Sequence, residues 1–152
     1  MLVEAADEQT RLHILLMMRV RPSTLASLVG SVCALSTTPA LSLDLNSFRA
    51  QHGRPPLSAS GALTSAAYSH AQSLAAGQRL DHAGFRQRIS LTSGAAAENV
   101  AYGCATEDCV IRMWARSGRH RANMLRRDVT SYGIASAVGA NGKRYWVLEL
   151  GN

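Results

Sequence analysis

The sequence has few aromatic residues, few cysteines and no long apolar run. Only 5% of its 152 residues are Phe, Trp or Tyr, so Ala, Leu and Val must fill most of the core. Three cysteines are too few for a disulfide-dense mini-protein, and no run reaches the roughly 18 apolar residues of a membrane-spanning helix. A P-loop, a dinucleotide fingerprint, a G-x-S-x-G motif and an H-E-x-x-H motif are all missing. Any chemistry must therefore come from another set of residues.

The composition is that of one folded domain with an excess of positive charge. Hydrophobic residues make up 47% of the chain and charged residues 17%, which is typical of a globular protein. Sixteen Lys and Arg residues against ten Asp and Glu residues give a net charge of +6. This balance favours an anionic partner or surface, but it does not specify a fold.

Residues 1–42 are predicted to be an N-terminal extension that contains a secretory signal peptide. Arg19 and Arg21 precede a short apolar stretch, and small residues follow it as far as Ser42. Acidic residues shortly after Met1 are atypical of a signal peptide, so Met18 is the favoured start. The alternative is an amphipathic or disordered extension. Cleavage after Ser42 leaves a domain at 43–152 that is secreted or periplasmic.

The cysteines of the exported part are predicted to form a disulfide. Cys33 is lost with the signal peptide, which leaves Cys104 and Cys109. In an oxidising compartment the simplest state of two cysteines is a bond between them, and a pair of free thiols is the alternative. A zinc site of the C-x4-C type would need two more soft ligands, and no further cysteine is present.

Sequence periodicity predicts an α+β domain whose helices pack on a sheet. Helices are expected over 44–52 and over 106–117 with Thr106 as the cap, followed by a helical turn at 120–125. Another helix is expected around the periodic residues from Leu63 to Leu74, with Ser58 or Ser60 as the cap and Gly77 as the stop. Strands are expected over 98–102, 132–138 and 145–150. The last two would form a hairpin around a two-residue turn, Asn141-Gly142. In the last strand Trp146, Leu148 and Leu150 should face one side.

Four histidines and one acid are the candidate functional residues of this domain. His70 lies on the apolar face of a helix and is predicted to be a buried structural residue, and His52 stands at a helix end. His82, Glu98 and His120 could hold a divalent cation with an open coordination position. The same three residues could equally form a hydrogen-bonded polar cluster, because their spacing alone has no specificity.

Five motifs occur in one order along residues 43–152. They are Leu80-Asp81-His82, Glu98 to Gly103, Trp114 to Leu125, Tyr132-Gly133-Ile134 and Tyr145-Trp146. In this pattern the sequence resembles the CAP superfamily, also called the SCP or cysteine-rich secretory protein, antigen 5 and pathogenesis-related-1 domain, in its compact bacterial form. The resemblance implies an α-β-α sandwich with a central cavity. It also implies two histidines and two acids in that cavity, which bind a divalent cation in some members.

His82, Glu98 and His120 match three of these four cavity positions. The second acid falls on Ser117, and serine is a poor zinc ligand. Ala97 also replaces the glycine that usually precedes the Glu-Asn pair. The resemblance therefore makes a divalent cation such as zinc an option rather than a requirement.

The sequence favours a secreted, non-catalytic binding module for a lipid, a peptide or an anionic envelope component. We expect a monomer without a nucleic-acid partner. A hydrolase that uses a divalent metal at His82, Glu98 and His120 is the alternative, and a protein acting through its surface alone is a third option. Six arginines crowd one region as a solvated face or a contact for anionic polymer or lipid: Arg112, Arg116, Arg119, Arg121, Arg126 and Arg127.

Overall fold

The computed structural model of the protein describes residues 42–152. The predicted signal peptide, the start at Met18 and Cys33 lie outside the described residues. The elements follow in the order α2 (Leu45–Gln51), β1 (Ser58–Ala59), α3 (Gly61–Gly77), α4 (Phe85–Ile89), β2 (Ala97–Tyr102), α5 (Glu107–Ala115), α6 (Gly118–Met124), β3 (Ser131–Val138) and β4 (Arg144–Gly151). In this part of the chain no helix has the length and apolar character needed to span a membrane.

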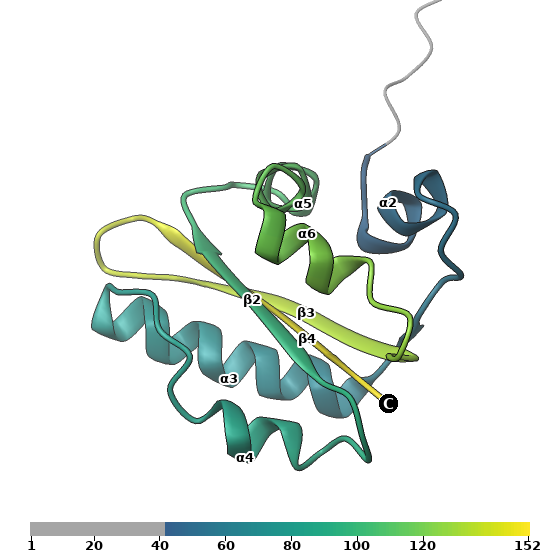
Figure 1. The fold of residues 1–152 in the computed structure, drawn as a ribbon. Coiled ribbons are helices and arrows are strands. Elements are labelled where there is room, and N and C mark those ends of the chain that lie inside the picture. The colour runs from purple at the N-terminus through teal and green to yellow at the C-terminus, as the bar shows by residue number, and fades with distance from the viewer. Residues whose placement is uncertain (1–41) are drawn as a thin grey trace, which may run out of the picture. The chain divides into compact units, whose positions relative to one another are not determined.

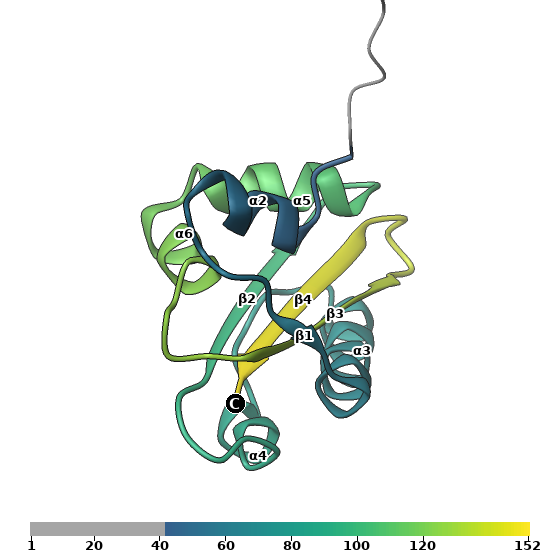
Figure 2. The same cartoon turned by 90° about the vertical axis from the view of Figure 1, so that its right-hand side faces the viewer.

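The strands form one mixed sheet between two layers of helices. Their order is β1-β3-β4-β2, with β1 parallel to β3 and the other neighbours antiparallel. Helices α2, α5 and α6 cover one face of the sheet, and α3 and α4 lie on the other (Figure 1; Figure 2). The predicted α-β-α sandwich is thus confirmed. The two-residue strand β1 was not predicted.

Local polar residues cap three of the helices, and two of these caps, Ser60 and Thr106, are among those predicted. The side chain of Asp44 caps α2, that of Ser60 caps α3 and that of Thr106 caps α5, each by accepting a hydrogen bond from a backbone N–H of the first turn. Helix α3 ends at Gly77, as predicted, and its C-cap residue Gln78 has a left-handed φ of 50°.

The hairpin between β3 and β4 differs from the predicted two-residue turn. The N–H of Gly142 donates to the carbonyl of Gly139, and the N–H of Gly139 donates to the carbonyl of Lys143. Gly142 has a φ of 73°, whereas Asn141 has no positive φ. A two-residue Asn-Gly turn needs positive φ at both positions, so the chain instead makes a longer loop that ends in a left-handed glycine.

Strand β4 is buried on both faces and divides the core into two clusters. Trp146, Leu148 and Leu150 pack with residues of α2, α5 and α6, which confirms their predicted common direction. Tyr145 and Val147 point the other way and pack against α3. Two of the aromatic residues, Tyr145 and Trp146, therefore lie at the centre of the sheet, where each can bury a large area.

The outer edge of β2 is covered by side chains from α5 and α6. Nε1 of Trp114 donates to the carbonyl oxygen of Val100 at 3.3 Å, and Nδ2 of Asn123 donates to the carbonyl oxygen of Glu98 at 3.2 Å. Nδ2 of Asn99 in turn donates to the carbonyl oxygen of His120 at 3.0 Å. These bonds satisfy backbone groups that an edge strand would otherwise leave open, and they fix α6 beside β2.

Candidate functional site

His82 and Glu98 form the centre of the candidate site. The loop after α3 carries His82 to the start of β2, where its Nδ1 lies 2.6 Å from Oε1 of Glu98. The Glu98 side chain is 2% exposed, whereas the His82 side chain is 57% exposed. A buried carboxylate therefore holds one edge of an imidazole ring that is otherwise open to solvent.

Two further charged residues complete this buried cluster. Glu149 of β4 stands opposite Glu98 in the sheet register, and its side chain is also 2% exposed. Arg88 of α4 donates from Nε to Oε1 of Glu149 at 2.6 Å and from Nη2 to Oε2 of Glu98. One guanidinium thus bridges two carboxyl groups on neighbouring strands. Sequence reasoning missed both residues, although a lone acid in the apolar strand 145–150 was an available signal for Glu149.

The two buried carboxyl groups differ in acidity because they interact with each other as well as with Arg88. Burial raises the pKa of Glu98, but hydrogen bonds with Glu149, His82 and Arg88 outweigh it and hold that pKa below its ordinary value. Burial first, and then the hydrogen bond and charge of Glu98, raise the pKa of Glu149 to about 8. At neutral pH, Glu98 is ionised and Glu149 keeps its proton.

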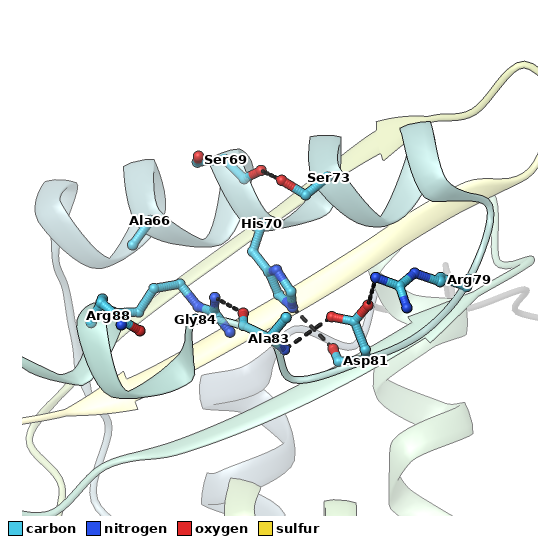
Figure 3. Close-up of a pocket in the computed structure, with 10 residues that line it drawn as sticks. Ala66, Ser69, His70, Ser73, Arg79, Asp81, Ala83, Gly84 and Arg88 are labelled. Carbon is cyan, nitrogen blue, oxygen red and sulfur yellow. Dashed lines mark hydrogen bonds and ion pairs between the residues drawn. The ribbon is translucent and has the colours of Figure 1, made fainter.

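His70 lies behind the pair and has the predicted structural role. It is buried on α3, with Nε2 3.0 Å from the carbonyl oxygen of Asp81 and 3.8 Å from Oε2 of Glu98. Figure 3 shows its ring projecting from α3 toward the loop that contains Asp81 and Ala83. Because a carbonyl oxygen only accepts, Nε2 of His70 carries the hydrogen in this contact.

A polar pocket of about 420 Å³ opens between α3 and α4, and His70 lines part of it. Ser69 and Ser73 line it from α3. Arg79 forms an ion pair with Asp81 at the pocket, with an N–O distance of 3.1 Å (Figure 3). Its charged side chains are thus already engaged with one another.

His120 and Ser117 lie along a second, apolar groove of about 450 Å³ beside β2. The groove is lined by Leu80, Val100, Ala101, Tyr102, Met113, Trp114, Ser117 and His120. Leu80 and Tyr102 are exposed in spite of their size and apolar character. Pockets of this volume and lining are suited to a small ligand with an apolar part.

His120 lies near His82, but its side chain makes no hydrogen bond with Glu98. His120 is half-buried in α6, with its ring centroid 6.5 Å from that of Trp114. Burial first, and the charge of His82 second, lower the pKa of His120. Ser117 precedes α6, and its side chain makes no capping hydrogen bond. Of the three predicted residues, only His82 and Glu98 are in direct contact.

The side chains as they stand do not fit a zinc ion held by His82, Glu98 and His120. Both oxygens of Glu98 accept hydrogen bonds, one from His82 and one from the positively charged Arg88. Within residues 42–152, no group of three or more His, Cys, Asp or Glu side chains is arranged to hold a metal ion. A neutral serine hydroxyl at the fourth position adds no strong ligand. Metal binding by these residues stays a prediction.

The arginines around α5 and α6 divide into paired and exposed residues. Arg112 is paired with Asp108, and Arg126 with Asp128. The other four are exposed and form no ion pair with another described residue, and we call them the arginine ridge: Arg116, Arg119, Arg121 and Arg127. Three of them, Arg116, Arg119 and Arg121, flank the groove residues Ser117 and His120 in the chain and add uncompensated positive charge there.

The predicted disulfide between Cys104 and Cys109 is present. It joins the turn after β2 to the first turn of α5. The carbonyl oxygen of Cys104 also accepts a hydrogen bond from Nε1 of Trp146 at 2.8 Å. This corner therefore links α5 to the centre of the sheet.

Solved structures of bacterial proteins share this fold. An outer surface protein from Borrelia burgdorferi has a TM-score of 0.63 at 19% identity, over 71% of this chain and 86% of the other. An extracellular protein containing a SCP domain from Bacillus anthracis has a TM-score of 0.60 at 19% identity, over 70% of this chain. A cysteine-rich secretory protein from Staphylococcus aureus has a TM-score of 0.54 at 22% identity, also over 70%. The likeness covers only 37% and 35% of the last two proteins.

A comparison with curated proteins finds no match. The sequence profile of the cysteine-rich secretory protein family, CAP, matches residues 44–150, which is nearly all of the described domain. The profile and the sandwich agree with the resemblance seen in the sequence motifs. The chain belongs to the CAP family.

Proposed function

We propose that this domain is a secreted, non-catalytic module that binds an anionic amphiphile. The apolar part of the ligand would lie in the groove beside β2, and its anionic head would contact the arginine ridge. The observation that carries the proposal is the adjacency of the two features: groove residues Ser117 and His120 are interleaved along the chain with Arg116, Arg119 and Arg121.

The groove supplies the apolar half of this recognition. Leu80 and Tyr102 remain exposed beside Val100 and Met113, so a hydrocarbon chain lying there would remove apolar surface from water. Each buried methylene contributes about 0.8 kcal/mol to such binding. A lipid-like ligand is therefore favoured over a purely polar polymer.

Export supports an envelope ligand. The predicted signal peptide directs residues 43–152 out of the cytoplasm. Two structural relatives are described as an outer surface protein and an extracellular protein. Outside the cytoplasm, anionic lipid headgroups and envelope polymers are the partners that a positively charged surface would meet.

Binding of lysophosphatidylglycerol and lysophosphatidylcholine, measured by calorimetry, tests the proposal. The wild type should prefer the anionic lipid, and Arg116→Ala/Arg119→Ala/Arg121→Ala should remove that preference. Arg79→Ala/Arg86→Ala removes two positive charges from residues that do not line the groove and should keep it. Equal binding of both lipids by the wild type, or an unchanged preference in the ridge variant, contradicts the proposal.

A second pair of variants tests the contribution of the apolar groove to lipid binding. Leu80→Asn/Tyr102→Ser changes two exposed groove residues and should weaken binding of both lipids. Leu91→Asn, at an exposed position outside the groove, should leave it unchanged. Binding of an apolar peptide at the groove without lipid binding would instead favour a peptide ligand.

The alternative is a divalent-metal-dependent hydrolase using His82, Glu98 and His120. It has less support, because Arg88 already donates a hydrogen bond to the Glu98 carboxylate that would bind the metal. Zinc titration of the wild type and of His82→Ala/His120→Ala, with turnover on a panel of esters and peptides, tests it. Stoichiometric zinc binding and turnover that both depend on the two histidines would replace the binding-module proposal.

A further inference from the structure

Arg88 makes two contacts that converge on His82. Its Nη2 donates to Oε2 of Glu98, and its Nη1 donates to the carbonyl oxygen of Ala83 at 2.6 Å. Glu98 holds the ring of His82, and Ala83 is the next residue in the loop. One side chain therefore fixes both the carboxylate that holds the imidazole and the backbone beside it.

Glu149 fixes Arg88 from the other side. Its Oε1 accepts from Nε of Arg88 at 2.6 Å, and the Arg88 side chain is only 13% exposed. A guanidinium is planar, and its donors have fixed directions, so anchoring Nε sets where the two Nη groups point. Glu149 on β4 thereby determines how Arg88 approaches Glu98 on β2.

These contacts also decide which nitrogen of His82 carries its hydrogen. Oε2 of Glu98 accepts from Arg88, and Oε1 faces Nδ1 of His82 at 2.6 Å. A carboxylate bound to a guanidinium is an acceptor, so Nδ1 of His82 must be the donor. In the neutral ring, Nε2 then has a free lone pair, and 57% of the side chain is open to solvent.

We propose that Arg88 and Glu149 are positioning residues that act through Glu98 to hold His82 as its Nδ1–H tautomer, with Nε2 presented to a ligand. The role does not depend on the amphiphile proposed above, since any ligand with a hydroxyl, an ammonium or another hydrogen-bond donor could meet this nitrogen. His70 does not help to orient His82, because its Nε2 donates to the carbonyl oxygen of Asp81.

Long-range ¹H–¹⁵N NMR spectra of His82 in the full chain test the inference, since they distinguish a protonated from an unprotonated ring nitrogen. In the neutral ring of the wild type, these spectra should show a protonated Nδ1 and an unprotonated Nε2. Glu149→Gln should preserve this pattern, because the amide oxygen still accepts from Nε of Arg88 and its NH₂ group replaces the carboxyl proton. Glu98→Gln should abolish the pattern.

Arg88→Met/Glu149→Leu removes the guanidinium together with its second carboxyl partner, so that no extra charge is left buried. The pattern at His82 should be lost in favour of a mixture of tautomers. Arg86→Met, an exposed arginine on the same short helix, is the matched control and should leave the spectrum unchanged.

Arg88→Lys keeps the positive charge but not the planar guanidinium with its several donors. This variant tests the role of Arg88 if the double variant does not fold. Loss of the Nδ1–H pattern in a folded Arg88→Lys protein is the expected result. A wild-type His82 pattern in either folded Arg88 variant overturns the inference. A wild-type protein with hydrogen on Nε2 overturns it as well, whatever the lipid-binding experiments show.

Discussion

Gly133 of β3 lies directly against the backbone of Thr64 in α3, so close that a Cβ atom on the glycine would be 2.1 Å from the Thr64 nitrogen. No flexible side chain stands between the two backbones. The φ of Gly133 is not positive, so lack of space, rather than an unusual backbone conformation, requires glycine here. The first turn of α3 can therefore rest on the sheet only because this strand position has no side chain.

Replacement of Gly133 by Ala should destabilise the domain by about 3 kcal/mol or more, since either the helix or the strand must move. Gly118→Ala is the control: a Cβ atom there meets nothing within 4 Å, and it should change the free energy of unfolding by less than about 0.5 kcal/mol. Urea unfolding of the two variants provides the comparison. Equal stability of both would mean that α3 does not sit against β3 as described.

The carboxyl pair should give the domain a pH-dependent stability that Glu149→Gln removes. The pKa of Glu149 rises from 4.5 to about 8 on folding, so the folded state binds a proton that the unfolded state has released. The stabilisation is complete below pH 4.5 and declines as the pH rises toward 8, by up to about 1.4 kcal/mol per pH unit. The difference in unfolding free energy between wild type and Glu149→Gln, measured from pH 4.5 to 9, should follow this decline. A difference that stays constant over this range would argue against a retained proton.

Asn123→Ala should cost about 1–3 kcal/mol, because it leaves two acceptors without their donor. Nδ2 of Asn123 donates to the carbonyl oxygen of Glu98 at 3.2 Å and to Oδ1 of Asn99 at 2.9 Å. Thermal unfolding should show the loss, and Gln72→Ala, an exposed change on α3, should have little effect. A loss no larger than that of Gln72→Ala would show that water replaces the amide at no cost.

Removal of the disulfide should lower stability by roughly 2 kcal/mol, because its ring is short and restricts few residues of the unfolded chain. The double variant Cys104→Ala/Cys109→Ala should unfold at a lower urea concentration than the wild type. A reducing agent should shift the wild type to the same midpoint and leave the variant in place. A wild type insensitive to the reducing agent would contradict the expected contribution of this bond.

The features that the sequence predicted correctly are those decided by neighbouring residues. Caps such as Ser60 and Thr106 act within one turn of their own helix, and the direction of Trp146, Leu148 and Leu150 follows from strand alternation. The hairpin loop was predicted less well, because Asn141-Gly142 fits two kinds of turn, and the hydrogen bonds of Gly139 decide between them.

The candidate site could be predicted only where family motifs pointed to it. His82 and Glu98 matched such motifs, and the structure places them in contact. Arg88 and Glu149 are 61 residues apart in the chain, and only the sheet register brings the acid opposite Glu98. The strand β1 was missed for the same reason, since its two residues have no pattern of their own and pair with distant Ser131 and Tyr132.

The side chains along the outer edge of β2 restrict how a ligand can approach the apolar groove. An extended peptide usually binds a sheet by lying alongside its last strand and exchanging main-chain hydrogen bonds. At this edge, Trp114 and Asn123 already occupy the carbonyl oxygens of Val100 and Glu98. A guest strand would have to displace an indole and an amide before gaining its first bond. Recognition in this groove should therefore select molecules by their shape and apolar surface and ignore the backbone of a peptide.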